Sequence, residues 1–279
     1  KLKMKIYYRI SDNSYKKEKI PGTSKELCLR NFIKCFSNSE ITIIADNCCQ
    51  DTINMVKSVV DCPILVTNLS NASSFDYCLD LALQNDLDCI NYFVEDDYIH
   101  QNNSALAIEE GLLKSDYVTL FDHPDKYESE YNYGETCKVF KTKSFIWRTT
   151  ISTCMTFASK TSTLKKDAST FKRNLFNKTH PDDHIIFKNL KEKNRTLSLP
   201  IGGLAYHVDL TYQMQKIKSL NESISLEESL GKFIDSWVLN SIQAELLDLI
   251  NIKTNKIITG VNNPDYSTLI ILDVYLKSE

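Results

Sequence analysis

The chain has 279 residues, of which 42% are hydrophobic and 25% charged, so it can bury the core of one large domain, or of one domain with a small appendage. The formal charge is only −3, which argues against a nucleic-acid partner. No apolar stretch approaches the roughly 18 residues of a membrane-spanning helix, so we expect a cytoplasmic protein without a transmembrane segment.

Apolar runs and helix-periodic segments alternate along the first hundred residues. We expect strands over 4–11, 40–46, 62–70 and 89–97, and helices over 24–36, after a cap at Asp51 or Thr52, and over 71–85. Strands that alternate with helices through short connections pair in parallel, with a right-handed crossover at each step. The pattern therefore predicts an α/β fold in which a doubly wound sheet is flanked by helices.

The second hundred residues mix helices with antiparallel strands. We expect a helix over 104–115, a strand over 116–123, an antiparallel hairpin within 137–160, two further helices, and a strand-like return over 196–210. The second of those helices opens on Pro181, Asp182 and Asp183, a favourable start because proline and acids suit the first turn. The nine cysteines lack the CxxC spacing of a zinc site and are expected to be mostly reduced core residues.

The composition changes near residue 223. Ser225 and Glu228 have the spacing of a capping box, and an apolar stripe that includes Trp237 follows them. We interpret 223–279 as a C-terminal helical extension to a domain over 1–222. The stripe either packs on that domain or on a second copy, and Trp237 favours the interface of a homodimer.

Three consecutive carboxylates, Glu95, Asp96 and Asp97, follow directly on the apolar run 90–94. Ligands of open α/β sheets bind outside the carboxyl ends of the strands, where these acids are expected to lie. Adjacent carboxylates repel one another unless a cation or hydrogen-bond donors compensate, and Mg²⁺ or Mn²⁺ prefers such oxygen ligands. The local sequence is equally compatible with helix capping by Asp96 and Asp97 and a solvent-facing Glu95.

The order of these motifs resembles the nucleotide-sugar-binding half of a glycosyltransferase of the GT-A fold, closest to the family-2-like group. The stretches that carry the resemblance are "ADNCCQDT", "NLSNASSFDYCLDLA" and "FVEDDY", in which Glu95-Asp96-Asp97 is a variant of the family's D-x-D motif. The glycine expected in the second stretch is absent. The similarity extends over roughly 4–212, and it implies a Rossmann-like mixed sheet with a nucleotide-binding half, 1–100, and an acceptor-side half, 101–222.

The resemblance also implies roles for individual residues. Asp46 would contact the base of the nucleotide, and Asp97 would bind the Mn²⁺ or Mg²⁺ that bridges the two phosphates. Glu95 would face the ribose or a metal-bound water. The remaining residues assigned to nucleotide binding are Arg9, Asn71 and Asp96.

Two later stretches match further parts of the family pattern. The acidic helix start "HPDDH" points to Asp183 as the catalytic base of an inverting enzyme, with Asp182 beside it; helix capping is the competing interpretation. In "GGLAYHVDL", His207 matches a histidine that returns to the metal, although a lone histidine at a strand end is often structural. Candidate contacts to the donor sugar or the acceptor, each with a structural alternative, are Asp122, His123, Trp147 and Arg148.

The resemblance implies a metal-dependent glycosyltransferase that moves a sugar from a UDP-sugar to a carbohydrate or other hydroxyl acceptor. A sugar-phosphate nucleotidyltransferase is the alternative enzyme, because it also uses strand-end acids and a metal. Such enzymes carry a Gly-rich basic loop after the first strand, whereas the corresponding segment here has one glycine, Gly22. A non-catalytic module whose acids merely hold a metal is the third interpretation.

Overall fold

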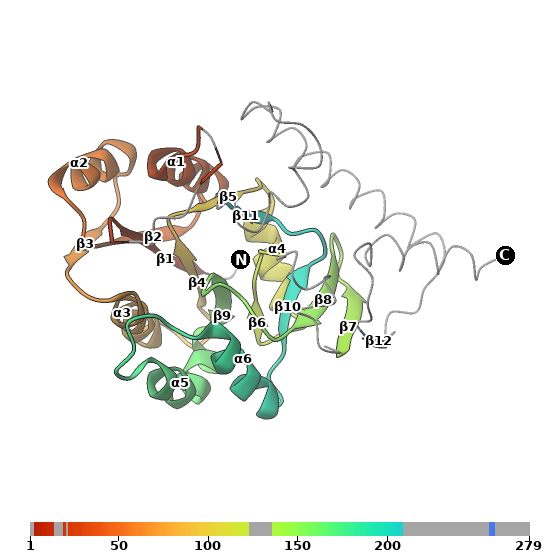
Figure 1. Ribbon diagram of the computed structural model, residues 1–279. Helices are drawn as coiled ribbons and strands as arrows, with labels where there is room; N and C mark the ends of the chain where they lie inside the picture. Colours follow the sequence, from red (N-terminus) through yellow and green to blue (C-terminus); the bar gives the residue numbers. More distant parts are fainter. Residues whose placement is uncertain (1–2, 14–18, 21, 123–135, 209–256, 260–279) are drawn as a thin grey trace.

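The computed structural model describes residues 3–13, 19–20, 22–122, 136–208 and 257–259 (Figure 1). The first half of the chain forms β1 (Met4–Ser11), α1 (Lys25–Cys35), β2 (Glu40–Asp46), α2 (Gln50–Val59), β3 (Ile64–Thr67), α3 (Asn71–Leu83) and β4 (Ile90–Glu95). The second half forms β5 (Tyr98–His100), α4 (Ser104–Gly111), β6 (Tyr117–Val118), β7 (Thr136–Lys141), β8 (Ile146–Thr150), β9 (Phe157–Lys160), α5 (Thr161–Leu175), α6 (Asp183–Glu192), β10 (Leu197–Pro200), β11 (Ala205–His207) and β12 (Ile257–Thr259).

The main sheet has ten strands in the order β12-β7-β8-β10-β6-β9-β4-β1-β2-β3. Strands β3, β2, β1 and β4 pair in parallel, as the alternation of strands and helices predicts. The remaining pairs include antiparallel ones, with β9 inserted between β4 and β6. The predicted fold class, an α/β mixed sheet flanked by helices, is therefore confirmed.

The chain reverses its direction of growth across the sheet between β1 and β4. From β1 it proceeds outward through β2 to β3, and then returns to place β4 on the other side of β1. Such a reversal is a topological switch point, and open α/β sheets commonly bind ligands outside the carboxyl ends of the strands at such a point. The register pairs Arg9 of β1 with Glu95 of β4 at this edge.

Several local expectations need correction. The predicted strand-like return over 196–210 is divided into β10 and β11, which belong to different sheets. The predicted hairpin within 137–160 is formed by β7 and β8 alone, because β9 leaves it to pair with β4 and β6. Helix α2 begins at Gln50 with Cys49 as its N-cap residue, two residues before the predicted start. The predicted extension over 223–279 lies outside the described residues except for β12, a strand that pairs antiparallel with β7.

Apolar side chains cover both faces of the sheet. Because successive side chains of a strand point to opposite faces, Tyr8 of β1 packs with Phe32 of α1, whereas Tyr7 lies in the cluster that contains Phe75 of α3 and Phe171 of α5. Five cysteines, Cys28, Cys35, Cys78, Cys89 and Cys137, are buried. Helices therefore hold the parallel strands from both sides, which fixes the positions of the strand ends.

A buried histidine lies in the cluster beneath α1. The Nε2 atom of His100 is 2.8 Å from the hydroxyl oxygen of Tyr92, and the edges of Phe32 and Phe36 meet the imidazole ring. Burial lowers the pKa of His100 to about 3, so the imidazole is neutral at ordinary pH. Protonation of His100 is therefore coupled to unfolding.

We expect His100 to make the protein sensitive to acid. The pKa rises from about 3 in the folded chain to an ordinary value of 6.5 when the chain unfolds, so the free energy of unfolding falls as the pH drops from 6.5 toward 3. The His100 contribution to this slope approaches about 1.4 kcal/mol per pH unit. A His100→Gln variant, which does not titrate, should lose less stability between pH 7 and pH 4.5 in urea titrations. Parallel losses in the two proteins would contradict the assignment.

Candidate active site at the carboxyl edge of the sheet

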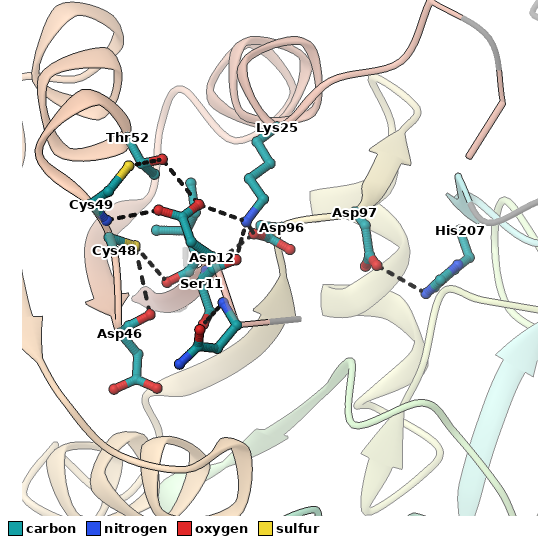
Figure 2. A network of polar contacts seen from close by, with 12 residues as sticks. Ser11, Asp12, Lys25, Asp46, Cys48, Cys49, Thr52, Asp96, Asp97 and His207 are labelled. Carbon is teal, nitrogen blue, oxygen red and sulfur yellow. Dashed lines mark hydrogen bonds and ion pairs between the residues drawn. The ribbon is translucent and has the colours of Figure 1, made fainter. Parts of the chain in front are cut away.

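The three carboxylates at the end of β4 point in different directions. Each faces a different basic side chain: Arg9 from β1, Lys25 from α1 and His207 from β11. Figure 2 shows Lys25 descending to Asp96, and Asp97 turned away from that pair toward His207. Arg9 and Lys25 thus offset part of the repulsion that the sequence places at this strand end, and His207 is a third polar neighbour of the acids.

The first carboxylate, Glu95, is held in a partly buried ion pair. Its Oε1 accepts a hydrogen bond of 2.7 Å from Nη2 of Arg9, whose side chain is only 6% exposed. Arg9 also donates from Nη1 to the side-chain and backbone oxygens of Asn71, at 2.8 and 3.1 Å. Burial raises the pKa of Glu95 above its ordinary value, although the adjacent Arg9 opposes that shift. Arg9 therefore ties the ends of β1 and β4 to the start of α3.

Removing Arg9 is expected to destabilise the protein. An Arg9→Met variant leaves Glu95 partly buried without its partner, which should cost about 3 kcal/mol of unfolding free energy. The matched control is Arg30→Met, which breaks an exposed pair with Glu26 on α1 and should cost at most about 0.5 kcal/mol. Urea denaturation midpoints measure both losses. Equal losses would show that the Arg9 pair does not support the fold.

The second carboxylate, Asp96, is buried and joins β4 to β1 and α1. Its Oδ2 accepts a hydrogen bond from the backbone N–H of Ser11 at 3.2 Å and lies 3.1 Å from Nζ of Lys25. Lys25 also pairs with Asp12 at 3.3 Å and donates to the backbone oxygen of Ser11. Burial alone would lower the pKa of Lys25, but Asp96 and Asp12 raise it above its ordinary value. Asp96 thus acts as a structural anchor in this structure.

Asp12 extends this network to α2. Its Oδ2 accepts a hydrogen bond of 2.8 Å from the backbone N–H of Cys49, and its Oδ1 accepts one of 3.0 Å from the hydroxyl of Thr52 (Figure 2). These bonds satisfy donors in the first turn of α2 and lower the pKa of Asp12, although partial burial opposes the shift. Cys49 makes no side-chain cap of its own. The early start of α2 is therefore explained by a cap from a distant strand end.

The third carboxylate, Asp97, lies beside His207. Its Oδ2 is 3.3 Å from Nε2 of His207, and the two side chains are 18% and 14% exposed. The short strand β11 pairs antiparallel with β5 and sets His207 opposite Tyr98, while the Val208 N–H donates to the Asp97 backbone oxygen at 2.9 Å. The ring of Tyr98 meets the imidazole edge-on. Packing and strand register together orient His207 toward Asp97.

The pair of Asp97 and His207 has the chemistry that a divalent cation needs. Carboxylate oxygen and imidazole nitrogen both bind Mn²⁺, and adjacent ligands of an octahedral ion at about 2.1 Å lie about 3 Å apart. The observed Oδ2–Nε2 distance of 3.3 Å fits that spacing. Among the described residues no group of three or more potential ligands occurs, so an ion at this pair would need further ligands from outside the pair. Ions of this kind complete their coordination with substrate phosphates and water.

Asp46 ends β2 at the same edge and is almost fully buried. Its Oδ1 accepts hydrogen bonds from the Thr67 hydroxyl at 2.8 Å and the Leu69 N–H at 2.7 Å, and its Oδ2 accepts one from Asn47 at 2.9 Å. A carboxylate has about four lone-pair sites, so these three bonds leave room for one further donor. The side chain is rigidly positioned, and its predicted contact with a base stays a prediction.

The predicted acidic helix start is present in α6, and its two acids differ in their contacts. Asp182 is the N-cap residue, exposed, with Oδ1 accepting from the Ile185 N–H at 3.1 Å. Asp183 instead turns toward the loop between β8 and β9, where its Oδ2 accepts from the Thr153 N–H at 3.0 Å. The hydroxyl oxygen of Thr153 lies 3.1 Å from the Thr119 hydroxyl and 3.0 Å from the Thr156 carbonyl oxygen, and these contacts anchor the loop in the core. Capping thus accounts for Asp182 but not for Asp183.

The four candidate sugar contacts separate into different environments. Trp147 is fully buried, stacks on Phe140 and donates from Nε1 to Thr142 at 2.9 Å, so it is a core residue and offers no face to a sugar. Arg148 is buried as well. Asp122 accepts from the Gly202 N–H at 2.8 Å, which supports a structural turn, and His123 lies outside the described residues.

Comparisons with known proteins add similarities of overall structure only. No protein-family model and no curated protein matches the chain. A CMP:2-keto-3-deoxy-manno-octonic acid synthetase complexed with CTP has 11% identity, covering 78% of this chain and 98% of that one, with a TM-score of 0.45. S. aureus TarS, residues 1–349, has 13% identity, 99% and 81% coverage and a TM-score of 0.42. The galactosyltransferase LgtC with donor and acceptor sugar analogues has 10% identity, 67% and 70% coverage and a TM-score of 0.41.

These three similarities, with TM-scores below 0.5, support no conclusion about function. In the described part of the chain, no helix is long and apolar enough to cross a bilayer.

Lys25 was not predicted from the sequence as a residue of the candidate site, although its position in the chain gives one indication of that role. Lys25 is the first residue of α1, where a positive charge meets the positive end of the helix dipole. A cation in that unfavourable place indicates nearby acids, which here are Asp96 and Asp12.

Proposed function

We propose that the protein is a metal-dependent glycosyltransferase that moves a sugar from a UDP-sugar to a hydroxyl acceptor with inversion at the anomeric carbon. The observation that carries the proposal is the pairing of Asp97 with His207 beside the β1–β4 switch point. A diphosphate bound outside the carboxyl ends of these strands would reach a carboxylate and an imidazole that fit one Mn²⁺ or Mg²⁺. When bound, that ion stabilises the charge that develops on the departing nucleoside diphosphate.

The donor site proposed here uses side chains that the protein already holds in place. Three hydrogen bonds from protein groups already occupy lone pairs of the Asp46 carboxylate. Its remaining lone pair would accept a hydrogen bond from a donor on the base of the nucleotide. Arg9 and Glu95 position the strand ends and the start of α3, where Asn71 is exposed. In this proposal Arg9 and Asp96, predicted as nucleotide-binding residues, support the site, because each makes hydrogen bonds to other protein groups.

The transfer step requires a base beside the acceptor, and Asp183 is proposed for that role. The acceptor oxygen attacks the anomeric carbon, its proton passes to the Asp183 carboxylate, and the bond to the diphosphate oxygen breaks with both electrons leaving on that oxygen. The hydrogen bond from the Thr153 N–H holds the Asp183 carboxylate in place at the start of α6. Attack opposite to the leaving group inverts the configuration.

A nucleotidyltransferase is the second candidate, and the position of Lys25 favours it. Lys25 follows β1 in the chain and lies at the carboxyl edge beside Asp96 and Asp12. A lysine there could bind the phosphates of a nucleoside triphosphate that reacts with a sugar phosphate. Two existing ion pairs occupy this lysine, which is why we place this candidate second.

Product analysis with the full chain separates the candidates. With Mn²⁺ present, a panel of UDP-sugars is expected to give UDP release that increases when hydroxyl acceptors are added. Nucleoside triphosphates with sugar 1-phosphates should give no pyrophosphate. Pyrophosphate release would establish the second candidate, and metal binding without either product would indicate a non-catalytic module.

A further inference from the structure

An exposed surface of mixed basic and apolar character lies where α5 leads into α6. We define the α5–α6 surface by Arg173, Phe176, Lys178, Ile185 and Lys188, all of which are exposed. Phe176 is 73% exposed, more than any other large hydrophobic side chain of the described residues, and Ile185 is 46% exposed. Large apolar side chains that are this exposed, with basic side chains near them in the chain, are typical of a surface that binds a partner.

The positive charge of this region is local. Residues 165–195 contain nine Lys and Arg against four Asp and Glu, in a chain whose formal charge is −3. Lys172 is paired with Asp76 and Asp80, and Arg195 with Asp167. The ion pairs found among the described residues do not include the three basic members of the α5–α6 surface.

Helix geometry intersperses the basic and apolar members. Arg173 lies in the last turn of α5, and Phe176 is the C-cap residue of that helix. Ile185 and Lys188 are three residues apart on α6, a spacing that makes side chains neighbours on a helix surface. Figure 1 shows α5 and α6 side by side, and Asn189 bonds to Asn174 between them at 3.5 Å.

The connection between the two helices also reaches the carboxyl edge. The carbonyl of Thr179 accepts from the Ala72 N–H at 3.1 Å, at the start of α3 and next to the residue that Arg9 holds. Asp183 begins α6. The α5–α6 surface is therefore joined directly to the candidate active site.

We propose that the α5–α6 surface docks the protein onto an anionic lipid bilayer. Phe176 and Ile185 would enter the headgroup region, and Arg173, Lys178 and Lys188 would contact lipid phosphates. A bilayer supplies both an apolar phase and a negative surface, whereas a nucleic acid or an acidic peptide supplies mainly charge. Asp182, also exposed on this connection, opposes the attraction in part. Docking would turn the candidate site toward acceptors held at a membrane, but it does not depend on the proposed transfer reaction.

Vesicle flotation without nucleotide tests the docking. The full chain is expected to float with vesicles of phosphatidylcholine mixed with phosphatidylglycerol, to remain unbound with phosphatidylcholine alone, and to dissociate as salt is raised. Phe176→Ser and the double variant Lys178→Gln with Lys188→Gln should each weaken binding about tenfold or more. Leu113→Ser removes another exposed apolar side chain, 70% exposed after α4, and should leave binding unchanged.

Several outcomes would overturn the docking. These are no binding to the mixed vesicles, equal binding to neutral vesicles, and an equal loss in Leu113→Ser. Heparin serves as a soluble polyanion in a parallel measurement. If heparin binds as tightly as the vesicles and Phe176→Ser changes neither, the surface recognises charge alone and its partner is a soluble acidic molecule. Thermal melting of each variant checks that a loss of binding is not a loss of fold.

Discussion

Asp97→Asn is expected to lower the rate of sugar transfer about 10³-fold. The substitution removes the negative charge of a proposed metal ligand, and such a ligand supports several kcal/mol of charge stabilisation at the leaving group, at about 1.4 kcal/mol per tenfold change. The side chain is only partly buried, and an amide replaces the carboxylate with little change in size. Stability should therefore change much less than activity.

UDP release from the preferred donor measures this effect, and calorimetric titration of Mn²⁺ in the presence of UDP measures metal affinity separately. The matched control is Asp88→Asn, an exposed carboxylate in the turn before β4. We expect that control to retain full activity. Unchanged Mn²⁺ affinity and unchanged transfer in Asp97→Asn would remove Asp97 from the site and, with it, the proposed function.

Asp183→Asn should reduce transfer about 10²- to 10⁴-fold, the usual contribution of a general base. The neighbouring Asp182 provides the control, because both acids open α6 but only Asp183 turns to the Thr153 N–H. Asp182→Ala removes the N-cap and should cost about 1 kcal/mol of stability with little loss of rate. The pair of variants separates proton transfer from helix capping.

The pH dependence of transfer gives an independent measure of the base. In the original protein the rate should fall on the acid side, where the carboxylate becomes protonated, and Asp183→Asn should lose that limb of the profile. A rate within a few-fold of the original, with the acid limb kept, would exclude Asp183 as the base and favour a mechanism with retention. Comparing the anomeric configuration of donor and product would then decide between the two.

Secondary structure in this protein was largely predictable because apolar periodicity is a local property. The strands β1 and β2 match the predicted 4–11 and 40–46 within a residue, and α1 lies within the predicted 24–36. The start of α2 was not predictable in this way. Its N-terminal donors are satisfied by Asp12, which is 37 residues away from Cys49 and enters through tertiary contact. Local sequence offered only Asp51 and Thr52 as caps.

The sequence predicted where the acids of the candidate site lie better than it predicted which side chains contact them. Parallel strands bring their carboxyl ends to one edge, so the positions of Asp46 and residues 95–97 followed from the order of the elements. From the sequence alone, Trp147 could be either a core residue or a contact to a sugar. The structure shows that it is buried, because β8, which carries Trp147, pairs with β7 on one side and β10 on the other.

By itself, the sequence determined the alternation of strands and helices, the edge at which polar residues gather, and the three consecutive acids behind an apolar strand. Only the tertiary structure decided that these acids have three separate partners. Arg9 comes from β1, Lys25 from α1 and His207 from β11, and each reaches the end of β4 across many residues of chain. The physical reason is that repulsion between neighbouring carboxylates is visible in the sequence, whereas the charges that relieve it depend on strand order, register and packing.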